Sequence, residues 1–168
     1  MSYSQLLVPE LEMEMATTRR VIERIPNEKF GWKAHEKSNT MGWVVNHLAE
    51  IPGWVEGTLA SDVWDICPVG GSSYQSPSFA TIEEVLASFD ANVAMAIKGL
   101  KAATDEELEK SWSLASGGQT LMTFRKLDVM RLWIISHTIH HRAILTVYMR
   151  LNDIPVPAVY GPSGDEQA

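Results

Sequence analysis

The sequence has one cysteine, Cys67, so no disulfide can form within the chain. Charged residues, proline or glycine interrupt every apolar stretch before it reaches the roughly 20 residues that a membrane-spanning helix needs. The first residues also lack the basic segment and apolar run of a secretory signal. We therefore expect a cytoplasmic protein without a membrane partner.

Positive charge is scarce as well. Lysine and arginine number 14 against 21 aspartate and glutamate residues, which gives a formal net charge of −7. The basic residues are scattered along the chain, whereas proteins that bind nucleic acids cluster them on one surface. The sequence therefore predicts no direct nucleic-acid partner.

The length of 168 residues is typical of one domain and allows about two-thirds of the surface of the unfolded chain to be buried. We expect residues 1–168 to form that single domain. Proline and glycine are frequent from Ile154 onward, so residues 153–168 are predicted to be an extended tail rather than a helix.

Four segments repeat apolar residues at steps of three and four, the period of an amphipathic helix. They are residues 4–25, a stretch that begins near Thr40, residues 81–102 and residues 123–151. Pro26 ends the first segment, and Pro52 is expected to kink the second about one turn past His47. Thr81 and Glu84 form the capping-box pattern at the start of the third segment.

The connections indicate how these helices are arranged. About 20 residues rich in glycine, serine and proline separate the second and third helices, which is enough for a crossover between two parallel neighbours. The stretch SWSLASGGQTLMT alternates apolar residues on both sides of a Gly-Gly turn, as a short β-hairpin does. We predict an all-α fold, a four-helix bundle of up-down-down-up order, to which a short hairpin can attach between the third and fourth helices.

Three histidines occur within five positions of the apolar fourth segment, in ISHTIHHRAI at residues 135–144. His137 and His141 are four residues apart, so they project to the same side of a helix and can bind one metal ion. His140 is three residues from His137 and satisfies the spacing equally well. The apolar stripe favours His141, because that residue is in step with Ile134 and Leu145.

A single inward-facing histidine is most often a core residue with satisfied hydrogen bonds. Two on one apolar stripe are harder to explain, since each unsatisfied ring nitrogen costs about 1 to 3 kcal/mol. His47 lies on the apolar stripe of another helix and faces the same interior. Three neutral imidazoles can hold a metal ion and leave a coordination position open. His35, in a polar loop, is expected at the surface.

Two other residue types near His47 allow more than one interpretation. Trp43 and Trp54 are expected to pack in the core, and they can also form the wall of a pocket. Glu50 is one turn from His47 and could support it or act in catalysis, although a lone acidic residue is more often solvated.

The blocks GWKAHEKSNTMGWVVNHLAEIPGW and SHTIHHRAILTVYMRLNDIPVPAVYG resemble the DinB-like (damage-inducible) family of four-helix-bundle metalloproteins. The resemblance covers nearly the whole chain and includes the order H…HxxxHR. It implies that His47, His137 and His141 are the ligands of a divalent metal ion, commonly zinc or nickel, and that His140 is not. It also implies a homodimer packed through helices.

The resemblance implies a class of chemistry and no particular reaction. The expected function is that of a metal-dependent enzyme acting on a small molecule, either a hydrolase or a transferase that uses a low-molecular-weight thiol. A non-catalytic metal-binding protein, which responds to stress or binds a ligand, is the alternative. The sequence assigns no catalytic residue.

Overall fold

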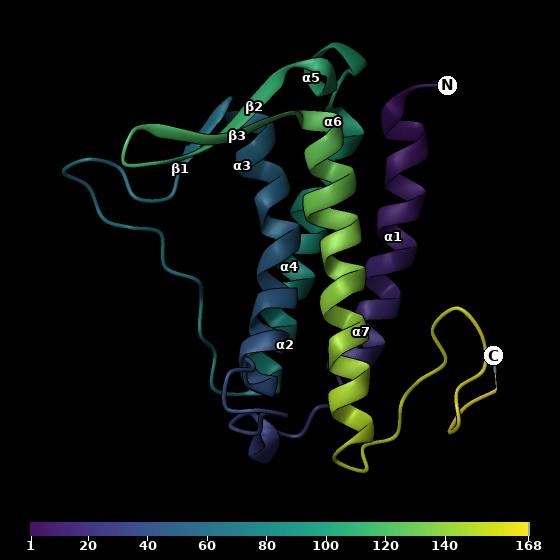
Figure 1. The fold of residues 1–168 in the computed structure, drawn as a ribbon. Helices are drawn as coiled ribbons and strands as arrows, with labels where there is room; N and C mark the ends of the chain where they lie inside the picture. The colour runs from purple at the N-terminus through teal and green to yellow at the C-terminus, as the bar shows by residue number, and fades with distance from the viewer. Residues whose placement is uncertain (168) are drawn as a thin grey trace.

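The computed structural model describes residues 1–167 as a bundle of four helical rods with a small sheet across one end (Figure 1). The first two rods are α1 (Tyr3–Ile22), then α2 (Met41–Glu50) continued through the 3-10 turn η2 (Ile51–Gly53) into α3 (Trp54–Ala60). The last two are α4 (Ile82–Ala102), then α6 (Lys126–Val129) continued through η3 (Met130–Ser136) into α7 (His137–Arg150). The 3-10 turn η1 (Asn27–Lys29) and the short helix α5 (Asp105–Glu109) lie in connections.

Local signals in the sequence set where these helices begin. Thr81 and Glu84 form the predicted capping box at the start of α4, and Thr40 caps α2 by accepting a hydrogen bond from the backbone of Trp43. Pro52 lies in η2, so the predicted disruption of the second helix takes the form of a 3-10 turn.

Hydrogen bonds between the rods fix their directions. Near the start of α1, Ser4 donates to the carbonyl of Ala103, which follows α4. In η1, after α1 ends, Asn27 accepts from the backbone of Ile82 at the start of α4, so α1 and α4 are antiparallel. The rod of α2 and α3 runs parallel to α4. Asn46 accepts a hydrogen bond from the backbone of Phe79, before α4 begins, and the later residue Ala49 accepts one from the side chain of Asn92, within α4. The loop between β1 and α4 therefore returns along the length of the bundle (Figure 1).

The structure is mostly helical, as predicted, but it is not purely all-α, because it contains a three-stranded sheet. Its strands are β1 (Val63–Asp65), β2 (Ser111–Ser116) and β3 (Gln119–Arg125). The antiparallel pair β2–β3 is the predicted hairpin, and Gly117 and Gly118 both have positive φ at its turn. Strand β1 pairs in parallel with β2, and a strand of three residues is too short to show a period in the sequence.

The fourth helix also differs from its predicted range of 123–151. Residues 123–125 belong to β3, and η3 is a π-helix rather than an α-helix. A π-helix bonds each residue to the fifth one along the chain, so it is wider than an α-helix and is often found at functional sites. Here it ends at Ser136, directly before His137.

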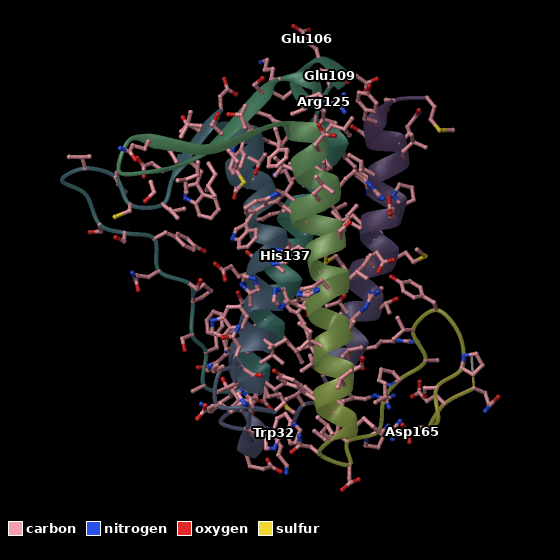
Figure 2. The ribbon with its side chains drawn as sticks, in the orientation of Figure 1. Trp32, Glu106, Glu109, Arg125, His137 and Asp165 are labelled. Atoms are coloured by element: carbon pink, nitrogen blue, oxygen red, sulfur yellow. The ribbon has the colours of Figure 1, made fainter. Side chains whose placement is uncertain are left out.

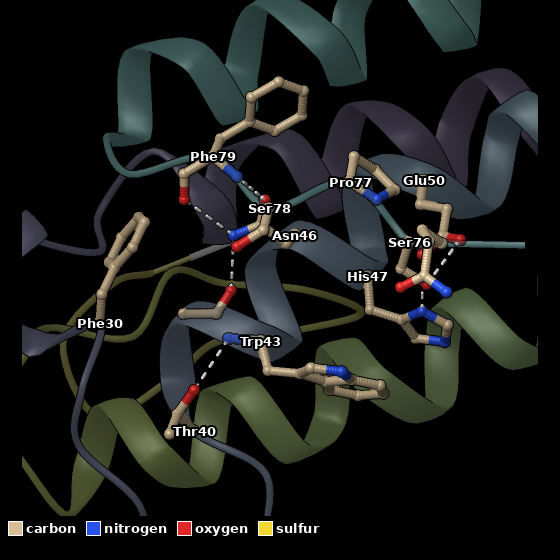
Figure 3. A pocket seen from close by; sticks show the side chains of 12 residues that line it. Phe30, Thr40, Trp43, Asn46, His47, Glu50, Ser76, Pro77, Ser78 and Phe79 are labelled. Carbon is tan, nitrogen blue, oxygen red and sulfur yellow. Dashed lines mark hydrogen bonds and ion pairs between the residues drawn. The ribbon is translucent and has the colours of Figure 1, made fainter.

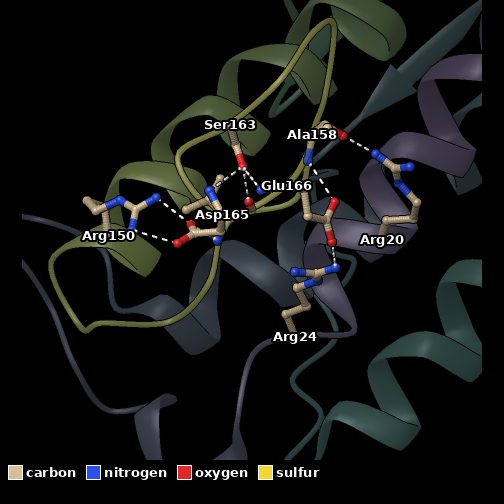
Figure 4. A network of polar contacts seen from close by, with 8 residues as sticks. Arg20, Arg24, Arg150, Ala158, Ser163, Asp165 and Glu166 are labelled. Carbon is tan, nitrogen blue, oxygen red and sulfur yellow. Dashed lines mark hydrogen bonds and ion pairs between the residues drawn. The ribbon is translucent and has the colours of Figure 1, made fainter. Parts of the chain in front are cut away.

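The chain after α7 folds back against the bundle (Figure 4). Arg20 of α1 binds the carbonyl of Ala158, and Arg24, just after α1, binds the carboxylate of Glu166. Arg150 of α7 pairs with Asp165. The predicted tail at 153–168 contains no helix within its described part, and Ala168 lies outside the described residues. Across residues 1–167, no helix combines the length and apolarity needed to cross a bilayer.

A buried ion pair joins α1 to α7 beside the histidines. The Arg142 side chain is 2% exposed and lies 2.7 Å from the Glu14 carboxylate, and the Tyr160 hydroxyl bonds both. Removing one partner of such a pair leaves an uncompensated buried charge. The pair therefore holds α1 against α7 only while both residues are present.

We predict that Arg142→Ala lowers the free energy of unfolding by about 3 to 5 kcal/mol, measured by urea denaturation. The matched control is Arg150→Ala, which removes the exposed pair with Asp165 and should leave the unfolding midpoint nearly unchanged. Equal losses in the two variants would show that burial of the Arg142 pair is not what matters.

Candidate metal centre

The structure brings together the three histidines that the sequence singled out. His47 comes from α2, and His137 and His141 come from α7, about midway along the bundle (Figure 2). One ring nitrogen from each lies within 4.8 Å of the others. His140 and His35 are both exposed, and neither belongs to this cluster.

The separations between the ring nitrogens suit a shared cation. Nε2 of His137 lies 3.4 Å from Nε2 of His47 and 2.9 Å from Nε2 of His141. Two nitrogens bound at about 2.1 Å to a tetrahedral ion lie about 3.4 Å apart, and about 3.0 Å apart at adjacent octahedral positions. The two observed values match these separations, and the third pair of ring nitrogens lies within 4.8 Å.

Glu50 is buried beside His47, contrary to the expectation that a lone acidic residue is solvated. Its side chain is 3% exposed, and Oε2 lies 3.2 Å from Nδ1 of His47. Oε1 accepts hydrogen bonds from the Tyr74 hydroxyl and, at 3.0 Å, from the Ser76 hydroxyl. Both donors come from the long loop before α4, and the sequence carried no signal that would have identified them.

The protonation of this group follows from its surroundings. Burial raises the pKa of Glu50, but hydrogen bonds from His47, Tyr74 and Ser76 outweigh that effect and bring its pKa below the usual value. The ionised Glu50 carboxylate accepts a hydrogen bond from the Nδ1–H group of His47. The Nε2 atom of His47 therefore presents a lone pair to the other two histidines.

The surroundings of His137 and His141 favour their neutral forms. Burial, followed by the proximity of His47, lowers the pKa of His137. Burial lowers the pKa of His141 to about 3, helped by His47 and then His137. Neutral imidazoles are the form that binds metal ions.

These protonation states leave the hydrogen bonds of the cluster incomplete. One proton on Nε2 of His137 or His141 can form the hydrogen bond between these two rings. The lone pair on Nε2 of His47 then has no donor, unless His137 gives up its bond to His141. Nδ1 of His141 is buried and has no hydrogen-bond partner within residues 1–167. A divalent cation would accept all three Nε2 lone pairs together, so the donor set fits a metal ion better than it fits a satisfied core.

Tryptophan side chains surround the histidines. The Trp43 ring stacks on His47 at a centroid distance of 4.5 Å, and the Trp54 ring lies 5.5 Å from His47 and 5.7 Å from His137. Trp43 is 39% exposed, so it forms a wall of the site and is not a core residue. Trp54 is half-buried and packs against the core.

Three cavities border this centre. One of about 460 Å³ is lined by Trp43, Asn46, His47 and Glu50 together with residues 75–79 (Figure 3). A second, of about 420 Å³, lies on the other side of Glu50, and a third, of about 360 Å³, is lined by His137 and His140. Molecules from solution can therefore approach the histidines from more than one side.

Fold and site together define a helical bundle that carries three converging histidines. The sequence profile of the DinB superfamily matches residues 10–145. The chain therefore belongs to the DinB superfamily. No curated protein matches the sequence significantly.

Solved structures share this fold at low sequence identity. A DinB-like protein from Bacillus cereus ATCC 10987 is 19% identical with a TM-score of 0.68, and the match covers 92% of this chain and 95% of that one. A DinB-like protein from Bacillus subtilis, YjoA, is 16% identical with a TM-score of 0.67, covering 90% and 96%. YfiT from Bacillus subtilis is 15% identical with a TM-score of 0.68, covering 90% and 89%. YfiT is described as "a probable metal-dependent hydrolase with an unusual four-helix bundle topology".

We predict that Glu50→Gln weakens metal binding about 10- to 100-fold, because the amide no longer fixes the proton on Nδ1 of His47. Titration of the metal-free protein with Zn²⁺ or Ni²⁺ by calorimetry measures this. Glu56→Gln, on the exposed side of α3, is the control and should bind as the unchanged protein does. Equal affinity of Glu50→Gln and the control would remove this role from Glu50.

Proposed function

We propose that the protein is a metal-dependent enzyme that acts on a small molecule, and that its reaction is a hydrolysis. The observation that carries this proposal is the convergence of one ring nitrogen from each of three histidines, whose hydrogen bonds to one another cannot all form at once. His47, His137 and His141 would hold the ion. Zinc and nickel both accept such ligands.

A divalent ion held there would lower the pKa of a water molecule toward about 7 and polarise an oxygen of the substrate. Both oxygens of Glu50 are already hydrogen-bonded, so Glu50 holds His47 in place and is not a free proton acceptor. Trp43 stacks on the ring of His47 and Trp54 lies against its edge, so both help to fix its orientation. We assign no catalytic residue besides the ligands.

The enzymatic proposal is supported by what surrounds the ligands. A purely structural metal site usually closes its shell with four protein ligands, whereas three histidines leave a position for another molecule. The cavities beside His47 and His137 give that position access to a small substrate. YfiT, which shares the fold and is described as a probable hydrolase, agrees with this proposal.

Transfer of a low-molecular-weight thiol is the second candidate reaction at the same centre, because a bound divalent ion also stabilises a thiolate. Thiols of this class commonly carry carboxylates, and the residues that line the three cavities include no lysine or arginine to bind them. This absence favours hydrolysis. A non-catalytic role in metal or ligand binding would be indicated by metal-loaded protein that turns over neither esters and amides nor thiol acceptors.

We predict that His137→Ala abolishes metal content and activity, because two histidines from different helices do not hold the ion. Elemental analysis of purified protein and turnover of a panel of esters, amides and thiol acceptors measure the two effects. His35→Ala, an exposed histidine outside the cluster and outside the cavities, is the matched control and should retain both. Turnover by a metal-free preparation would contradict the proposal.

We also propose that the four rods have the order up-down-down-up, and that two copies of the chain associate through the outer face of α7. Val147 of α7 and Leu151, the residue directly after α7, are four residues apart and are 57% and 60% exposed. Apolar side chains exposed in a row commonly mark an interface, and a second copy supplies the same row across a two-fold axis.

We expect Val147→Lys to convert a dimer to a monomer in sedimentation measurements, because it places charge in the row. Met95→Lys, which adds the same charge on α4, should leave the mass unchanged. A monomer in the unchanged protein would remove the proposed interface.

A further inference from the structure

Three aromatic rings form the walls of the cavity on the far side of Glu50 from Trp43. Trp54 comes from α3, Trp64 from β1 and Tyr74 from the long loop, so three separate segments supply the walls. The Trp54 and Trp64 rings are 5.9 Å apart and inclined by 59°, and the Trp64 and Tyr74 rings are 4.9 Å apart and inclined by 87°. We call these three residues the aromatic cage.

The charge around the cage is of one sign. Glu50 lines the same cavity, and none of the residues that line it is lysine or arginine. Lys126, on the neighbouring α6, is already paired with Asp62 at 2.8 Å and with Glu107. Three aromatic rings and one carboxylate therefore line the cavity with no cation among the lining residues, and aromatic rings of this kind attract cations.

The cavity has room for a ligand group. A Cβ atom added at Gly57, which lines it, would meet no atom within 4 Å. The volume of about 420 Å³ exceeds what a single ammonium group with its alkyl substituents occupies.

We propose that the aromatic cage binds the organic cation of a ligand, an ammonium group that carries alkyl substituents. Such groups lose little hydration energy on burial and are held by the faces of tryptophan and tyrosine. The Trp54 ring neighbours Trp64 of the cage and also His47 and His137, so the cage lies next to the candidate metal centre. The proposal that organic cations are the substrate class rests on the proposed function. Binding of an organic cation by the cage does not require the metal.

The test compares three probes of the same shape in metal-free protein by calorimetry. Choline carries the cation, 3,3-dimethylbutan-1-ol replaces it with a neutral carbon, and 3,3-dimethylbutanoate carries a negative charge. We expect choline to bind about tenfold tighter than the alcohol, and the carboxylate to bind least. Equal binding of choline and the alcohol would overturn the proposal, because the cavity would then select shape alone.

Two variants locate the binding. Trp64→Leu should weaken choline binding about tenfold and leave the alcohol unaffected, and Trp133→Leu, at the cavity beside His140, is its control. Gly57→Leu fills the cavity and should abolish choline binding, with Gly57→Ala as its control, so the test survives if Trp64→Leu does not fold. Choline binding unchanged in both Trp64→Leu and Gly57→Leu would place the site elsewhere.

The two proposals fail separately. If choline binds the cage and no metal binds the histidines, the organic-cation site stands and the proposed hydrolase does not. If metal binds and choline does not, the proposed function stands without this substrate class.

Discussion

The hydrogen bond between Glu50 and His47 is the interaction on which the candidate site depends. A buried carboxylate is stable only when its lone pairs are satisfied, and here His47, Tyr74 and Ser76 satisfy them. The same bond places the proton of His47 on the nitrogen that faces away from α7. The nitrogen that faces His137 and His141 is therefore free to bind, and the long loop is tied to the bundle.

Much of the helical architecture follows from short-range signals. The capping residues Thr40 and Thr81 and the disruption at Pro52 are read directly from residue type and spacing, because they act within one or two turns. The turn at Gly117 and Gly118 is equally local. Strand β1 was not predictable, because its three residues are ordered by pairing with β2, which lies about fifty residues away in the sequence.

The candidate site was predictable where its residues share a helix and unpredictable where the loop contributes. His137 and His141 are related by helical spacing, and His47 lies on an apolar stripe, so all three can be proposed from the sequence. Glu50 looked like an ordinary solvated carboxylate, because its burial depends on Tyr74 and Ser76. Those two residues are at no regular spacing from it, and only the path of the loop brings them close.

The π-helix η3 has a consequence for the placement of the histidines. Each residue of an α-helix turns the chain by about 100°, and a π-helix accommodates a residue more per turn than the α-helix does. Shortening Met130–Ser136 by one residue would let this rod wind as a regular helix, and α7 would then be rotated relative to α6 by about that angle. The imidazoles of His137 and His141 would then face away from α2. The extra residue of the π-helix therefore sets the rotation of α7, which carries the histidines, relative to α6, which adjoins the sheet.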